Sequence, residues 1–255
     1  MNRLASVFLM SLSTVLIGCA KDTNFAPPAD SEYVTVTVKV PPDFEPETMQ
    51  VVYRSSVCKR RTSDSAGRPF EIEGFNSMKI QPRRLETKEL YEAKIAVNGG
   101  GQCGWRLSNV TFGITHPHPI VHGADWFAGG GGVVVIFDNN NSGRGGADFF
   151  VDGNLHLVKD YYYWISERFL GGHVKTLSLF GGGYGYLMYN AATAKEIYFE
   201  PVVHSKYVLR SVGPKVKKDG NHPTFTYPDG STFSNGKPAS FARLEAIRHT
   251  AEAEK

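Results

Sequence analysis

Residues 33–40 read Tyr33-Val34-Thr35-Val36-Thr37-Val38-Lys39-Val40, and every second residue of this stretch is valine. Successive side chains of a β-strand point to opposite faces, so strict alternation of apolar and polar residues predicts a strand with one buried face. Pro41-Pro42 follows directly. The strand should end there because proline has no backbone N–H to give to a sheet. The chain is therefore expected to begin its fold with a strand packed on a core.

Similar patterns recur along the rest of the chain, separated by Gly-rich and polar stretches. We expect strands over residues 49–54, 89–97, 107–114, 133–137, 161–165, 174–180, 184–189, 196–199 and 207–212. Short strands at this spacing are typical of an antiparallel sandwich. The sequence thus predicts a mainly β protein whose N-terminal half, residues 33–116, is an antiparallel immunoglobulin-like β-sandwich.

The second half, residues 117–255, is expected to be β-rich and to end in one helix. His116-Pro117-His118-Pro119 marks the boundary, since two prolines prevent regular hydrogen bonding there. Pro228-Asp229-Gly230-Ser231 has the composition of a hairpin turn. The helix is predicted over 240–253, with Ser240 as its N-cap and with Phe241, Leu244 and Ile247 on one face.

The N-terminus resembles a bacterial lipoprotein signal peptide. Arg3 supplies a positive start, an apolar run follows, and Leu16-Ile17-Gly18-Cys19 ends it. The resemblance implies removal of residues 1–18 and acylation of Cys19, with residues 19–32 as a flexible tether to the fold. Two or three acyl chains anchor a protein stably to a membrane. Ala20 stands where an Asp commonly retains such lipoproteins at the inner membrane, so the periplasmic face of the outer membrane is favoured.

Charge and cysteine content limit what the protein can do and where it resides. The formal net charge of +3 predicts no nucleic-acid binding. Once Cys19 carries lipid, Cys58 and Cys103 are the two remaining cysteines. Thiols of exported proteins tend to pair, so we expect a disulfide between them, with two separate buried thiols as the alternative.

Signatures of catalysis are missing from the sequence. It contains no Gly-x-Ser-x-Gly elbow, no His-Glu-x-x-His and no phosphate-binding loop, which argues against an enzyme and against a cofactor. His116, His118 and His122 are weak candidates for a metal site, because alternating histidines on an extended segment point the same way. A Pro-rich surface loop explains the same residues better, so no metal is predicted.

Aromatic residues beside glycine-rich turns are the chief indication of protein recognition. Trp126, Phe127, Tyr184 and Tyr186 lie in such places and are weak candidates for partner contacts, because large aromatics are enriched in interface hot spots. Filling of a sandwich core is the alternative role for many of the chain's aromatic residues.

Two segments carry a likeness to a known family. They are Met49-Gln50-Val51-Val52-Tyr53-Arg54-Ser55 leading to Cys58, and the run from Gly99 through Cys103-Gly104-Trp105-Arg106-Leu107 to Gly113. Together with the signal peptide, they resemble lipoprotein immunity proteins encoded beside phospholipase effectors of type VI secretion systems. The resemblance covers roughly residues 33–115. It implies a periplasmic protein that binds and neutralises a cognate lipase effector without catalysis of its own. A structural, assembly or glycan-binding lipoprotein of the envelope is the alternative.

Overall fold

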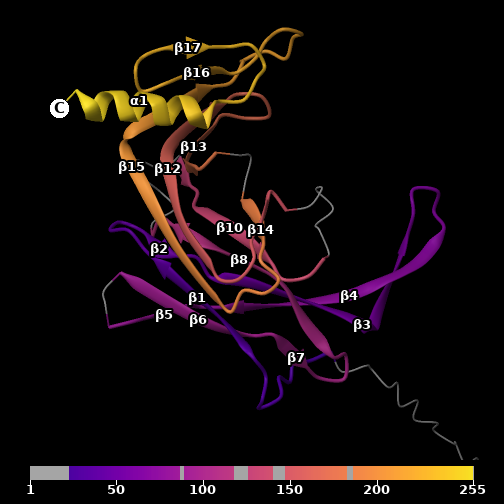
Figure 1. The fold of residues 1–255 in the computed structure, drawn as a ribbon. Coiled ribbons are helices and arrows are strands. Elements are labelled where there is room, and N and C mark those ends of the chain that lie inside the picture. The colour runs from indigo at the N-terminus through magenta and orange to yellow at the C-terminus, as the bar shows by residue number, and fades with distance from the viewer. Residues whose placement is uncertain (1–22, 87–88, 118–125, 140–146, 183–185, 255) are drawn as a thin grey trace, which may run out of the picture.

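The computed structural model describes residues 23–86, 89–117, 126–139, 147–182 and 186–254. These residues form two packed β-sheets and one C-terminal helix, α1 (Phe241–Ala253) (Figure 1). The mainly β character and the C-terminal helix are confirmed. No helix in the described ranges is long and apolar enough to cross a membrane.

The first sheet, sheet A, has eight strands. Their bounds are β2 (Glu45–Pro46), β3 (Met49–Ser63), β4 (Pro69–Ile80), β7 (Asn98–Gly100), β8 (Trp105–Thr115), β10 (Gly131–Ile136), β11 (Phe149–Phe150) and β14 (Leu187–Asn190). The order along the sheet is β11-β14-β10-β8-β3-β4, and β2 and β7 also pair with β8. Strand β4 therefore forms one end of sheet A.

The second sheet, sheet B, has nine strands. Their bounds are β1 (Tyr33–Lys39), β5 (Arg83–Arg84), β6 (Leu90–Ala96), β9 (Trp126–Ala128), β12 (Leu155–Arg168), β13 (Val174–Phe180), β15 (Glu196–Val212), β16 (Thr224–Thr226) and β17 (Thr232–Phe233). The order is β5-β6-β1-β15-β12-β13-β9, and the short hairpin of β16 and β17 continues from β15.

The alternating valines of β1 lie where the sequence predicts them. Val34, Val36 and Val38 are at most 1% exposed and belong to the core between the two sheets. Met49 and Phe112 enter the same core from sheet A. A fully buried apolar side chain of this size stabilises the fold by about 1.5–3 kcal/mol, so this stripe is a main source of stability.

The predicted immunoglobulin-like, purely antiparallel sandwich is wrong. Strand β1 pairs antiparallel with β6 on one side but parallel with β15 on the other, where Val36 lies opposite Ile197. Parallel pairs also join β12 to β15 and β10 to β14. Both sheets are mixed, and in each of them the strands from before residue 116 lie together on one side and those from after it on the other. A period of two in the sequence identifies a buried face but does not specify the neighbouring strands.

Strands β12 and β15 are longer than predicted and serve two cores. Residues 196–199 and 207–212, expected as two strands, are one strand, β15. A bulge between Tyr162 and Tyr163 shifts the register of the β12–β15 pair. Two adjacent tyrosines near this bulge point into different cores. Tyr161 is buried in the core between the sheets, and Tyr162 is buried in a second core.

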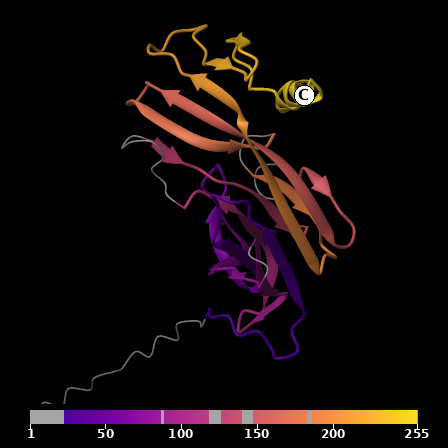
Figure 2. The same ribbon diagram turned by 90° about the vertical axis from the view of Figure 1, so that its left-hand side faces the viewer.

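The second core belongs to a C-terminal cap, which we define as β16, β17 and α1. It packs at the end of β12, β13 and β15, at the top of both views (Figures 1 and 2). Its buried members are Tyr162, Phe180, Leu209, Phe225, Tyr227 and Leu244. The predicted N-cap is confirmed, since the Ser240 side chain accepts a hydrogen bond from the backbone N–H of Arg243. Sheet-packed aromatic residues thus hold a helix whose sequence alone is only weakly amphipathic.

Candidate interaction site

Strands β3 and β4 extend beyond sheet A as a two-stranded arm. We define the hairpin arm as residues 56–75. Strand β3 pairs with β8 only as far as Arg54, whereas its pairing with β4 continues from Arg60 opposite Ile72 to Ser63 opposite Pro69. The arm consequently projects from the body of the molecule (Figure 1). Within the described residues, its strands pair only with each other.

A disulfide holds the base of the arm. Cys58 and Cys103 are bonded across 45 positions of sequence, with their Cα atoms 5.2 Å apart, which confirms the predicted pair. Ser55, 2% exposed, accepts hydrogen bonds from the backbone N–H groups of Val57 and Cys58 and donates to the Cys103 carbonyl. These bonds shape the irregularity in β3 between Ser55 and Arg60.

Gly74 is required at the same base. A Cβ atom at this position would lie 1.8 Å from the carbonyl oxygen of Cys58, closer than any real contact. Only glycine allows the β4 backbone to approach the bulge of β3 this closely. The disulfide and Gly74 therefore fix the direction in which the arm leaves the sheet.

Large apolar side chains of the arm face solvent. Val57 is 60% exposed, Phe70 46%, Ile72 38% and Phe75 56%. Phe70 and Ile72 are two residues apart on β4 and so share a face. Phe75, an odd number of positions from Ile72, lies on the other face of β4. Both faces of this short hairpin thus expose large apolar side chains, and exposed apolar surface of this kind marks places that bind other molecules.

Charges on the arm leave a positive surplus. Glu73 pairs with Arg54 at 2.9 Å, and Glu71 lies 3.7 Å from Lys59. At the tip, Asp64 accepts from the backbone and side chain of Arg68, which lowers the pKa of its carboxyl group.

Two further cations belong to the arm. The Arg60 guanidinium lies 5.1 Å from the centre of the Phe75 ring, and Arg61 has no ion pair in the described part of the chain. Because the arm's carboxylates are already paired, an acidic partner surface would complement it.

The first described residues pack close to this base. Thr23 offers its carbonyl to the side-chain N–H groups of Asn76, at 2.9 Å, and Trp105, at 3.1 Å. The Phe25 ring lies 4.8 Å from that of Tyr53. We expected residues 19–32 to be a flexible tether, but those from Thr23 to Ala26 are held against sheet A by these contacts and by the Ala26–Gly99 hydrogen bond.

The histidines proposed as weak metal ligands do not form a described site. His116 packs between Phe44 and Tyr163, and its Nε2 is buried with no hydrogen-bond partner among the residues that the structure describes. Burial lowers its pKa. His118 and His122 lie outside the described residues, and no group of three or more metal-binding side chains occurs in the described ones.

The four aromatic candidates for partner contacts are not brought together in the described structure. Trp126 and Phe127 are in β9, of which only the backbone is described, and Tyr184 lies outside the described residues. The Tyr186 hydroxyl is 3.0 Å from both carboxylate oxygens of Glu47. Burial raises the pKa of both Tyr186 and Glu47. Tyr186 thus has a structural partner inside the molecule.

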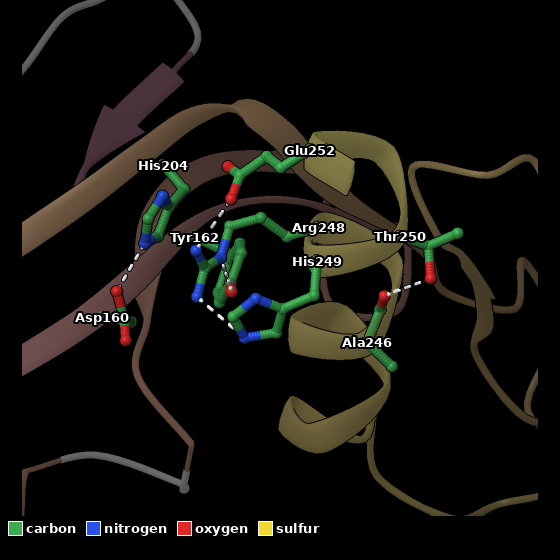
Figure 3. A network of polar contacts seen from close by, with 8 residues as sticks. All are labelled: Asp160, Tyr162, His204, Ala246, Arg248, His249, Thr250 and Glu252. Atoms are coloured by element: carbon green, nitrogen blue, oxygen red, sulfur yellow. Dashed lines mark hydrogen bonds and ion pairs between the residues drawn. The ribbon is translucent and has the colours of Figure 1, made fainter. Parts of the chain in front are cut away.

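A network of hydrogen bonds and ion pairs joins the cap to the sheet (Figure 3). Arg248 Nε donates to the Tyr162 hydroxyl at 2.9 Å, and its Nη1 lies 3.2 Å from Glu252. Tyr162 stacks on His204, which in turn contacts Asp160 at 2.5 Å. Each charged group in this network has a partner within the chain, so its role is structural.

Comparisons with known proteins found nothing similar. No family model, no curated protein and no solved structure matches the chain. The function of the protein must therefore be inferred from its own residues and their geometry.

Sequence reasoning missed the hairpin arm. Lys59-Arg60-Arg61 has the character of a solvated loop, and residues 62–68 that of a polar break between strands, whereas β4 carries strand residues from Pro69 onward. The alternation Phe70-Glu71-Ile72-Glu73 was the available signal.

Proposed function

We propose that this protein is a periplasm-facing lipoprotein that binds and neutralises a secreted antibacterial lipase effector, as an immunity protein of a type VI secretion system. The observation that carries the proposal is the hairpin arm, with Phe70, Ile72 and Phe75 exposed. A rigid hairpin with exposed aromatics binds at low entropic cost, since its base is already fixed by a disulfide. Its surplus Arg60 and Arg61 suit an acidic patch on the effector.

The position of the anchor supports the same proposal. Thr23 follows Cys19 by four positions, a reach of at most about 14 Å in an extended chain. Thr23 is held beside Asn76 at the base of the arm. An acylated Cys19 would thus keep the arm's base near the membrane surface, where a lipase must act.

Acylation is tested first, by mass spectrometry of the protein extracted from membranes. We expect a mature chain that begins at Cys19 and carries acyl chains. An unmodified Cys19 thiol would remove the anchor from the proposal.

Binding is tested by co-purification with the product of the adjacent gene, followed by a protection assay. Deletion of this gene should make cells sensitive to siblings that deliver the effector, and periplasmic re-expression should restore resistance. We expect nanomolar affinity or tighter, about −12 kcal/mol or more favourable. Phe70→Ser should weaken binding at least tenfold.

Phe150 supplies a matched control. It is 75% exposed and lies on β11, at the end of sheet A opposite to β4. Phe150→Ser should leave binding and protection unchanged. Full resistance of the deletion strain, with no complex formed, would instead favour an assembly or glycan-binding lipoprotein of the envelope.

A further inference from the structure

A groove opens between the two sheets on the side where β10 begins and β13 ends. It encloses about 250 Å³. Its lining includes Gly131, Tyr161, Trp164, Phe180 and Tyr186. A second hollow of about 190 Å³ shares Trp164 and Phe180 with it and reaches Phe225 and Pro238 of the cap region. The Trp164 and Phe180 rings thus border both hollows.

Glycines give this groove its shape. A Cβ atom at Gly131 or Gly181 would lie 2.6 or 2.5 Å from the Tyr161 ring, and one at Gly132 would lie 2.3 Å from the Tyr186 ring. The two tyrosine rings therefore lie directly on the bare backbone. This close approach explains the glycine-rich sequences at both ends of the groove.

One cation, Lys159, stands at the groove among these apolar groups. Its ammonium donates to the Gly181 carbonyl and lies 5.3 Å from the centre of the Tyr161 ring and 5.6 Å from that of Phe241. No carboxylate is within ion-pair distance of it in the described part of the chain. The neighbouring Asp160 is engaged with His204 at 2.5 Å.

Lys159 is partly buried, and taking a cation even partly out of water without a counter-ion costs free energy. Burial lowers the pKa of Lys159, and the more distant charges of Asp160 and Glu245 oppose that shift. A bound anion would offset this cost. A single ammonium suits a singly charged head group, and the Trp164 and Phe180 rings that line the same groove suit a hydrocarbon chain.

We propose that this groove binds a long-chain carboxylate, with its carboxylate on Lys159 Nζ and its hydrocarbon chain along Trp164 and Phe180. This site is separate from the hairpin arm and does not rest on the function proposed above.

Quenching of Trp164 fluorescence by a brominated palmitate tests the site. The full chain would carry Cys19→Ser and be purified from periplasm without detergent, so that no covalent acyl chain competes. We expect saturable quenching that disappears in Trp164→Phe. Lys159→Met should weaken binding at least tenfold. Lys206→Met, which removes a cation on the neighbouring strand β15 that does not line this groove, should leave binding unchanged.

A neutral ligand decides the case even where a variant fails to fold. The brominated alcohol of the same chain length should bind the parent protein at least tenfold more weakly than the carboxylate. Equal binding of the two, or quenching that survives in Trp164→Phe or stays unchanged in a folded Lys159→Met, would overturn the proposal. Absence of saturable quenching would overturn it as well.

Discussion

The hairpin arm and the C-terminal cap both extend the sandwich along paired strands, but they treat their aromatic residues in opposite ways. The cap covers β12, β13 and β15 with a helix and a short hairpin, and its Phe225 is 8% exposed. Phe75 in the arm is 56% exposed. A two-stranded ribbon has no second layer against which to pack, so its apolar side chains stay in contact with water. The contrast separates aromatics that stabilise the fold from aromatics available for binding.

The largest effect on stability should come from loss of the Cys58–Cys103 disulfide at the base of the arm. Replacing both cysteines, Cys58→Ser with Cys103→Ser, should lower the free energy of unfolding by about 4 kcal/mol, because the bridge closes a 45-residue separation in the unfolded chain. Urea unfolding of the unreduced protein measures this. Trypsin should then cleave after Arg60 or Arg61 before it cleaves in the cap. An unchanged midpoint of urea unfolding would show that the disulfide does not stabilise the protein.

The second largest loss of stability should come from a cavity created in the core of the cap. Leu244 is fully buried, so Leu244→Ala should cost about 3 kcal/mol through lost burial and the cavity left behind. Thr250→Ala, on an exposed position of the same helix, is the control and should cost less than about 1 kcal/mol. Chemical denaturation distinguishes them. Similar losses for both would mean that the helix is not packed as the second core requires.

The hydrogen bond between Arg248 of the cap and Tyr162 of the sheet should contribute less to stability. Arg248→Met removes the hydrogen bond to Tyr162 and should cost about 1.5 kcal/mol, since charged hydrogen bonds contribute more than neutral ones. Tyr162→Phe removes only the hydroxyl group. A double-mutant cycle of these two changes should give a coupling energy of about 1 kcal/mol. A coupling near zero would assign the cap's attachment to its apolar contacts alone.

The smallest effect on stability should come from the exposed aromatics of the arm. Phe75→Ser should change the free energy of unfolding by about 0.5 kcal/mol or less, as for other exposed positions. Phe241→Ser in the cap, whose ring contacts Tyr162 and Phe180, should cost about 2 kcal/mol or more. Thermal melts of the two variants compare them directly. Equal losses would remove the distinction between the two regions.

Local sequence patterns predicted much of the fold. The valines of β1 are buried as expected, Ser240 caps α1, and the turn at 228–231 joins β16 to β17. The site was predicted less well. Of the proposed partner residues, Tyr186 has a described side chain, and it contacts Glu47 inside the molecule. The arm was missed because its first strand reads as a charged loop when β4 is not recognised beside it.

The sequence by itself indicated which faces are buried and, with Cys19 expected to carry lipid, that Cys58 and Cys103 would pair, because period, composition and count are properties of the chain that need no tertiary structure. Tertiary structure alone decided that β1 lies between β6 and β15, that the arm leaves the sheet without a cover, and that Lys159 stands at an apolar groove. These outcomes depend on contacts between residues far apart in sequence. An alternating pattern states that a strand has a buried face, but only the packed chain selects its neighbours.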